Sequence, residues 1–356
     1  MMRLQKLENS LDELKIDAVL IRDSYNRRYL SGFTGSNAYL YISRNVKKLL
    51  TDFRYTEQAN KQCPDFEVID YTKNGLLEIL NDIIIKDNAK IIGFEDETIS
   101  YKEFSTYEKG LDDVELLPIG DTVEKIRMIK DEEELKCIQK AASIGDLAYE
   151  HILKFVKPGV TEKEVALEIE TCMKKNGAEN LSFDTIVASG LNSSKPHAEP
   201  SDKKIEEGDF VTLDFGCVYK GYCSDMTRTF VVGKASEKQK EIYNIVLDAQ
   251  LKALEAVKAG CIGKDIDKIA RDIITDKGYG DNFGHGLGHS VGLFIHEEPR
   301  FSYSDENVFT ENMVVTVEPG IYVPGFGGVR IEDLVSVTKD GIINFVSSPK
   351  QLIELV

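Results

Sequence analysis

The chain carries Lys157-Pro158-Gly159-Val160 and, 101 residues later, Lys258-Ala259-Gly260-Cys261, each after a long helical pattern. At the same offset, both turns lead to a shorter helical pattern that ends in a glycine, Gly177 and Gly278. Apolar positions recur in step around the turns: Leu153 with Leu254, Val156 with Val257, and Val165 with Ile266. We therefore predict a pseudo-symmetric domain of two α+β halves, with a cleft between them as a natural place for a site.

The first third of the sequence has a different pattern, in which short apolar runs alternate with helical ones. Strands are predicted at residues 17–21, 39–42, 48–51, 67–71, 90–94 and 114–117. Such alternation is typical of an α/β sheet with helical crossovers. Gly120-Asp121-Thr122 then precedes a long acidic helix that starts near Asp131. The sequence thus predicts a small α/β domain over residues 1–122 and the α+β domain over residues 123–356.

The composition limits the classes of function. The 356 residues include 44 Lys and Arg against 61 Asp and Glu, a net charge of −17. So acidic a surface repels phosphate backbones, which argues against nucleic acid as a partner. No apolar run approaches the roughly 20 residues that span a bilayer, and the first residues lack the apolar region of a secretory signal. The six cysteines include no Cys-x-x-Cys pair, as in reduced proteins. We expect a cytoplasmic enzyme with no membrane partner.

Two strand-like runs around Tyr219-Lys220-Gly221 each contain an aspartate, Asp214 in the first and Asp225 in the second. A turn centred on Tyr219-Lys220 would place them directly opposite each other. A Lys220-Gly221 turn would instead place Asp225 opposite Gly216, still on the face of Asp214. In either register two carboxylates meet within apolar strands, which is unstable unless a cation lies between them. For Asp214 alone, an ordinary turn or salt-bridged residue is the alternative.

A second hairpin pattern has the same form. Apolar arms that contain Glu318 and Glu332 surround Pro324-Gly325-Phe326-Gly327. A hairpin centred on Gly325 sets the two glutamates opposite each other. Because this pair falls in the other half of the predicted pseudo-symmetric domain, chance is a poor explanation for both pairs.

Histidines gather just before this second pair. Three of the five in the chain, His285, His289 and His296, fall within 12 residues. Interleaved glycines argue against a helical zinc site and favour extended backbone that can approach a ligand closely. Four carboxylates and an imidazole would be unstable together, but two divalent ions offset the four charges. Such ligands favour Mn, with Co, Zn or Fe as alternatives, and two bridged ions suit the activation of water for hydrolysis.

In order and local context, five of these residues resemble the metal ligands of the pita-bread-fold metallopeptidases: Asp214, Asp225, His289, Glu318 and Glu332. That family includes Xaa-Pro aminopeptidases, proline dipeptidases, methionine aminopeptidases and the metal-free creatinases. The resemblance covers nearly the whole chain, because residues 29–36 (YLSGFTGS) and 50–55 (LTDFRY) resemble the creatinase/prolidase-type N-terminal domain. Methionine aminopeptidases lack that domain, and creatinases lack the full ligand set.

The resemblance implies a role for each metal ligand. Asp214 would bind one ion, and His289 and Glu318 would bind the other. Asp225 and Glu332 would bridge both ions. Glu318 would also move the proton of the attacking water.

It also implies roles around the metals. His197 matches the family's histidine on the substrate side, and His296 matches the one that supports the tetrahedral intermediate. His285 would line the proline pocket. Arg330 would support the carboxylates from behind.

The sequence therefore predicts a dinuclear metallopeptidase, by resemblance a homodimer, that cuts Xaa-Pro bonds in short proline-containing peptides. Proline lacks an amide N–H, so peptidases that hydrogen-bond this group handle it poorly. We favour an Xaa-Pro aminopeptidase, because the N-terminal motifs favour it and no Arg or Lys is identified to bind a dipeptide's proline carboxylate. A proline dipeptidase shares every ligand and is the first alternative. The others are a non-catalytic binding protein on the same scaffold and a hydrolase of a non-peptide amide or phosphoester.

Overall fold

A computed structural model describes residues 2–355, which form two compact units that divide between Arg127 and Met128. The sequence placed the domain boundary between residues 122 and 123. The intervening residues belong to α6 (Thr122–Met128), where the carbonyl of Ile126 accepts a hydrogen bond from the Tyr29 hydroxyl of the first unit. No helix within residues 2–355 is both long and apolar enough to cross a membrane.

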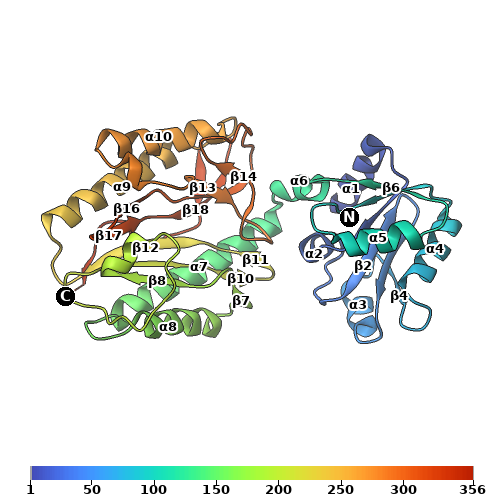
Figure 1. Cartoon of the computed structure of the whole chain (residues 1–356), viewed down its shortest axis with the longest axis horizontal. Coiled ribbons are helices and arrows are strands. Elements are labelled where there is room, and N and C mark those ends of the chain that lie inside the picture. The colour runs from blue at the N-terminus through green and yellow to red at the C-terminus, as the bar shows by residue number, and fades with distance from the viewer. Residues whose placement is uncertain (1, 356) are drawn as a thin grey trace. The chain divides into compact units, whose positions relative to one another are not determined.

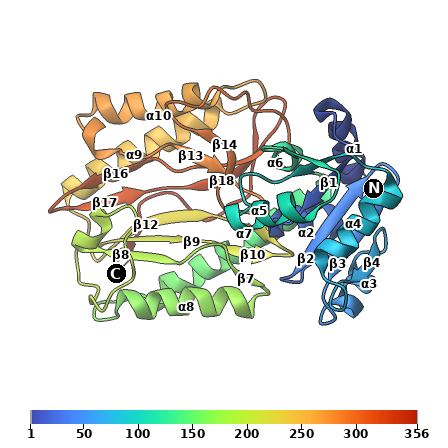
Figure 2. The ribbon, with the colours of Figure 1, turned by 45° about the vertical axis from the view of Figure 1, so that its right-hand side comes forward.

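The first unit is a mixed six-stranded sheet of order β4-β3-β2-β1-β5-β6, flanked by helices (Figure 2). Its strands are β1 (Ala18–Ile21), β2 (Ala38–Ser43), β3 (Lys47–Thr51), β4 (Glu67–Asp70), β5 (Ile91–Phe94) and β6 (Glu115–Pro118). Its helices are α1 (Met2–Leu14), α2 (Ser24–Ser31), α3 (Thr56–Gln62), α4 (Leu76–Asp87) and α5 (Tyr101–Gly110). The predicted α/β sheet is confirmed, and each predicted strand is present.

The second unit consists of two halves with the same order of elements, as predicted. The first half contains α7 (Glu132–Phe155), α8 (Glu162–Lys175), β7 (Asn180–Leu181), β8 (Ile186–Ser189), η1 (Gly190–Ser194), β9 (Phe210–Phe215), β10 (Cys217–Tyr219), β11 (Tyr222–Cys223) and β12 (Met226–Val232). The second contains α9 (Glu237–Ala256), α10 (Gly263–Asp276), η2 (Gly280–Asn282), β13 (Gly288–Ser290), β14 (Glu297–Phe301), β15 (Val314–Val317), β16 (Gly320–Val323), β17 (Gly327–Arg330), β18 (Asp333–Val337), β19 (Ile342–Asn344) and β20 (Glu354–Leu355). Gly159 and Gly260 hold the matching turns at φ of +95° and +90°, a conformation that favours glycine.

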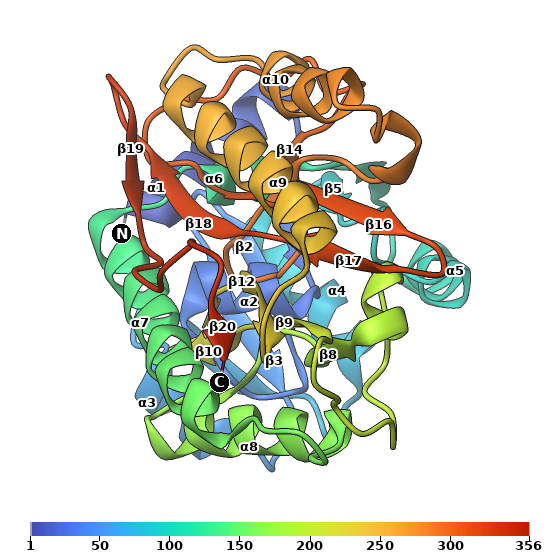
Figure 3. The same ribbon diagram turned by 90° about the vertical axis from the view of Figure 1, so that its left-hand side faces the viewer.

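The strands of the two halves lie between two pairs of helices. Figure 1 shows α9 and α10 on one side of them and α7 and α8 on the other, and Figure 3 shows the same unit from its end. The main sheets have the orders β20-β12-β9-β8 and β14-β13-β15-β18-β19, and β16 pairs with β17. This arrangement confirms the predicted pseudo-two-fold α+β architecture.

Both predicted hairpins are present. In the first, Asp214 pairs with Thr227, and Lys220 and Gly221 form the turn at φ of +48° and +88°. This is the second of the two registers considered, and positive φ at both turn positions is typical of tight hairpins. In the second hairpin, β16 and β17 pair symmetrically about Gly325. The pairing of β15 with β18 continues that register on the far side of Glu318 and Glu332.

Candidate metal centre

A cavity of about 630 Å³ opens among the strand ends of the second unit. It is lined by every residue that the sequence predicts for the site: His197, Asp214, Asp225, His285, His289, His296, Glu318, Arg330 and Glu332. These residues come from β9 and β13, from the ends of both hairpins, and from the loops that precede β9, β13 and β14. The fold thus brings together side chains that are separated by more than a hundred residues in the sequence.

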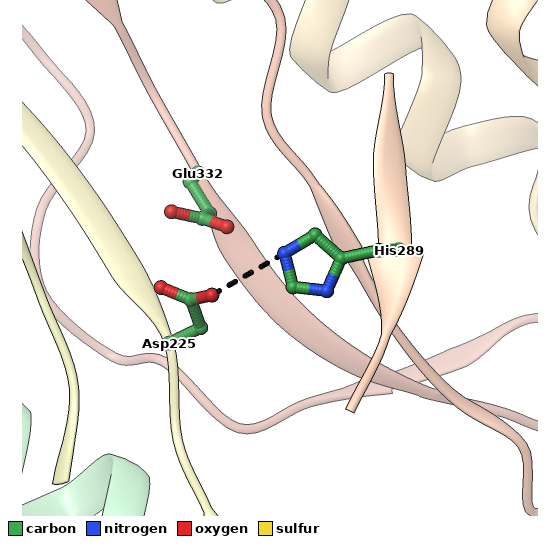
Figure 4. Close-up of side chains that lie close together, drawn as sticks. All are labelled: Asp225, His289 and Glu332. Carbon is green, nitrogen blue, oxygen red and sulfur yellow. Dashed lines mark ion pairs between the residues drawn. The ribbon is translucent and has the colours of Figure 1, made fainter. Parts of the chain in front are cut away.

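Asp225, His289 and Glu332 form a compact group, with one ligand atom of each within 4.8 Å of the others. Figure 4 shows both carboxylates facing one ring nitrogen of His289. This nitrogen, Nε2, lies 3.5 Å from Asp225 Oδ2 and 3.5 Å from Glu318 Oε1. Asp225 belongs to the first half of the unit, and His289, Glu318 and Glu332 belong to the second. These four residues therefore join the two halves.

Hydrogen bonding fixes the tautomer of His289. Its Nδ1 lies 3.1 Å from the carbonyl oxygen of Ser290, and a carbonyl can only accept, so Nδ1 carries the proton. Burial, followed by the neighbouring His296, lowers the pKa of His289 to about 3, and the ring is neutral at pH 7. Its Nε2 lone pair therefore faces carboxylate oxygens, an arrangement that calls for a cation between them.

The four carboxylates have fewer positive partners than negative charges. Burial, followed by the neighbouring carboxylates, raises the pKa of Asp225 and of Glu332 well above the usual range. Burial is also the main cause that raises the pKa of Glu318 to about 8. Asp214 Oδ1 is buried and accepts no hydrogen bond from the described part of the chain. The ion pair of Arg330 with Asp214 supplies one positive charge for four carboxylates, so this oxygen-rich donor set fits divalent metal ions.

Arg330 supports the carboxylates through three of its contacts, and its Nη1 also donates to the Pro196 carbonyl at 3.3 Å. Its Nη2 binds Asp214 Oδ2, and its Nε donates to Thr227 Oγ1 at 3.1 Å. Thr227 Oγ1 in turn donates to Glu332 Oε2 at 2.7 Å. The third contact runs from Nη1 to the hydroxyl of Tyr322 at 2.9 Å. One guanidinium therefore positions a carboxylate in each half of the domain.

Tyr322 connects Arg330 to His285 and was missed in the sequence. His285 Nδ1 lies 2.8 Å from the Gly286 carbonyl and must donate to it, so its Nε2 accepts from the Tyr322 hydroxyl at 2.9 Å. Burial lowers the pKa of His285 to about 4, which agrees with a neutral ring. Alternation along the strand could have identified Tyr322, because it lies four residues after Glu318 and faces the same way.

Arg300 is a second missed residue that lines the cavity. Its Nε donates to Glu298 Oε1 at 2.9 Å, and neither of its terminal nitrogens has a partner within residues 2–355. After burial, its charge is the next cause that lowers the pKa of His296. Along β14 (Glu297–Phe301), buried and exposed side chains alternate. His296, Glu298 and Arg300 therefore lie on one side of the strand.

Comparison with known proteins identifies the family. Residues 136–339 match metallopeptidase family M24, and residues 3–129 match the creatinase/prolidase N-terminal domain. The Xaa-Pro dipeptidase of Pyrococcus furiosus is 42% identical over 353 residues, which cover 99% of each chain.

Solved structures agree with this match. The chain superposes on an Xaa-Pro dipeptidase from Bacillus anthracis with a TM-score of 0.96, 47% identity and 99% coverage of both chains. An X-Pro aminopeptidase from Thermotoga maritima gives a TM-score of 0.92 and 40% identity, with 97% of this chain and 99% of that one covered. The pita-bread fold and the metallopeptidase class predicted from the sequence are thus confirmed, and membership implies divalent metal ions. The chain belongs to metallopeptidase family M24.

Proposed function

We propose that the protein is an Xaa-Pro dipeptidase that binds two divalent metal ions through Asp214, Asp225, His289, Glu318 and Glu332. The observation that carries the substrate assignment is Arg300, which lines the cavity and whose terminal nitrogens have no protein partner within residues 2–355. A guanidinium is suited to bind a carboxylate through two parallel hydrogen bonds. A dipeptide places the proline carboxylate next to the scissile bond, whereas a longer chain has an amide there. This reverses the preference drawn from the sequence, which rested on the N-terminal motifs and on the lack of an identified cation.

The names of relatives support the same assignment. The Pyrococcus furiosus and Bacillus anthracis proteins are both called Xaa-Pro dipeptidases. The Thermotoga maritima X-Pro aminopeptidase supports the alternative. The site carboxylates do not separate the two activities, so the proposal depends on Arg300. Manganese as the metal, the homodimer and the cytoplasmic location stay predictions.

The site residues divide the work of hydrolysis among them. Asp214, Asp225, His289, Glu318 and Glu332 would hold two divalent ions, whose chemistry when bound would be to activate a water and polarise the scissile carbonyl. Glu318 accepts the proton of the attacking water and passes it to the leaving proline nitrogen. His296 donates a hydrogen bond to the oxygen that gains negative charge, and His197 holds the substrate from its own side of the cavity. His285 uses both ring nitrogens within the protein, so it offers its ring as a wall for the proline.

The test compares Ala-Pro with Ala-Pro-Ala as substrates of the wild type and of Arg300→Met. We expect the wild type to prefer the dipeptide. Arg300→Met should lower kcat/KM for Ala-Pro about 10- to 100-fold, because hydrogen bonds between charged groups are worth about 1.5–3 kcal/mol. The tripeptide should change little. Lys264→Met is a matched control, since Lys264 forms an exposed ion pair with Glu306 and does not line the cavity.

Two results would contradict the assignment. If the wild type prefers the tripeptide, the protein is an Xaa-Pro aminopeptidase and the dipeptidase assignment is wrong. An equal loss for both substrates in Arg300→Met means that Arg300 does not read the carboxylate. Neither result affects the metal chemistry, which is tested separately by metal removal.

A further inference from the structure

Arg228 is a fully buried arginine of β12 that lines no part of the cavity. Its Nη1 donates to the backbone carbonyls of Thr227 and Glu332. Its Nη2 donates to Asp333 Oδ1 at 2.8 Å and to the Ser348 carbonyl at 2.8 Å. Its Nε donates to the Pro349 carbonyl at 3.1 Å. A guanidinium has five N–H groups, so each one has an acceptor.

Asp333 completes this arrangement on the other side of the guanidinium. Its Oδ2 accepts from Gln250 at 3.1 Å, from Asn344 at 2.7 Å and from Lys350 at 2.7 Å. Burial opposes the charged form, yet Arg228 and Lys350 prevail and lower the pKa of Asp333. Asp333 is therefore a buried, ionised carboxylate with a full set of donors.

These contacts hold the backbone of Glu332, the candidate metal ligand that precedes Asp333. The Glu332 amide donates to the Thr227 carbonyl at 3.1 Å, and the Glu332 carbonyl accepts from Arg228. The residue is thus fixed on both sides to β12. Asp225 lies just before the same strand, so this junction sets the distance between two candidate metal carboxylates that come from different halves.

The last part of the chain belongs to the same arrangement. Ser348, Pro349 and Lys350 all contact the Arg228–Asp333 pair. Asp146 of α7 accepts hydrogen bonds from Ser347 and Ser348, and β20 pairs in parallel with β12. Residues 347–350 are therefore held at both ends and support the guanidinium from the side that faces away from Glu332.

We propose that Arg228, Asp333 and residues 348–350 form a clasp that positions Glu332 for metal binding. This inference rests on the proposed metal site. A buried ion pair by itself is weak evidence for stability, since apolar residues of similar volume often serve as well. Here the pair has a different task, because Arg228 donates to the backbone carbonyl of Glu332 and its other contacts hold the guanidinium in place for that hydrogen bond. Arg228 acts as a positioning residue and touches neither substrate nor metal.

The test measures metal affinity directly. Metal-free full-length protein is titrated with Co²⁺ and followed by visible absorption and calorimetry, for the wild type, Arg228→Met and Arg228→Lys. Loss of the residues that orient metal ligands typically weakens metal binding about 10- to 100-fold, and we expect a loss of this size for Arg228→Met. Lysine keeps the charge but cannot reach all the carbonyls, so Arg228→Lys should lie in between.

Ile274→Ala is the control for general destabilisation. Ile274 is fully buried on α10, outside the strands that carry the candidate ligands. This variant should lower Tm while leaving Co²⁺ affinity unchanged. If Arg228→Lys binds Co²⁺ as the wild type does, or if affinity in all three variants simply follows Tm, the clasp is overturned. If Arg228→Met does not fold, Arg228→Lys decides alone. A wild type that binds no Co²⁺ overturns the proposed function itself, which is a distinct result.

Discussion

Raising the pH should weaken the fold of the metal-free protein, because the candidate metal carboxylates then lose protons that the folded state favours. Burial raises the pKa of Glu318 from 4.5 to about 8. Between these two values the folded state holds the proton and the unfolded state does not, so stability falls as the pH rises through this window. At about 1.4 kcal/mol per unit of pKa difference, the ionisation of Glu318 alone lowers the free energy of unfolding by about 5 kcal/mol across this window. Asp225 and Glu332 act in the same direction, since their pKa values are also raised.

Urea unfolding of the full chain at pH 5, 6, 7 and 8 in excess chelator measures this effect. Glu318→Gln keeps the shape of the side chain and removes its titration. The free energy of unfolding of this variant should therefore fall with pH less steeply than that of the wild type, with a slope that is smaller by about 1 kcal/mol per pH unit. Protein saturated with Mn should not lose stability over this range, because the ionised carboxylates are then bound to cations. A metal-free wild type whose stability is flat or rises with pH would refute the reasoning, as would equal slopes for the wild type and Glu318→Gln.

Three further predictions concern the same cavity. Chelation should abolish hydrolysis of Xaa-Pro substrates and lower Tm, and Mn or Co should restore both; full activity in protein that is metal-free by elemental analysis would exclude the metal mechanism. Glu332→Gln should lose at least one metal per chain. His296→Ala should keep the metal and lower kcat about 100- to 1000-fold. If elemental analysis instead finds that His296→Ala loses metal and Glu332→Gln does not, the roles of metal ligand and substrate-side residue are assigned the wrong way round. Tyr322→Phe removes the hydroxyl shared by Arg330 and His285 and should cost about 1–3 kcal/mol of unfolding free energy; unchanged urea unfolding would mean that this hydrogen bond adds no net stability.

The fold could be predicted where local chemistry and the repeat agree. The strands of the first unit are short apolar runs. In the second unit, the turns at Lys220-Gly221 and Gly325 determine the registers of the two hairpins. Two short helices of the first unit were not predicted. In α3 only Ala59 is buried, so the helix has almost no apolar periodicity to reveal it. Its position depends on tertiary contacts that the local sequence does not show.

The candidate ligands could be predicted because two carboxylate pairs and a cluster of histidines are rare in apolar strands. The supporting residues could not be predicted as easily. Tyr322 is one of 15 tyrosines, and only the folded structure shows that its hydroxyl contacts both Arg330 and His285. Arg228 could not be assigned a role from the sequence, since its acceptors include carbonyls of Ser348 and Pro349, more than a hundred residues away. Every residue carries a backbone carbonyl, so the sequence does not show which of them accept hydrogen bonds from Arg228.

Substrate length was harder to predict than the chemistry for a related reason. In the sequence, Arg300 stands two residues from Glu298 and is typical of an ordinary surface ion pair, which is worth little. In the structure that pair uses only Nε, and Arg300 lines the cavity with two terminal nitrogens that have no partner within residues 2–355. The hydrolytic chemistry requires five ligands at fixed spacing, so a substitution there is visible as a broken pattern. A dipeptide requires one cation at the right distance from the metals, and several positions on the wall could provide it. Under the proposed function a single side chain sets the preferred substrate length, so Arg300→Met should separate the two activities more cleanly than any change at the metal ligands.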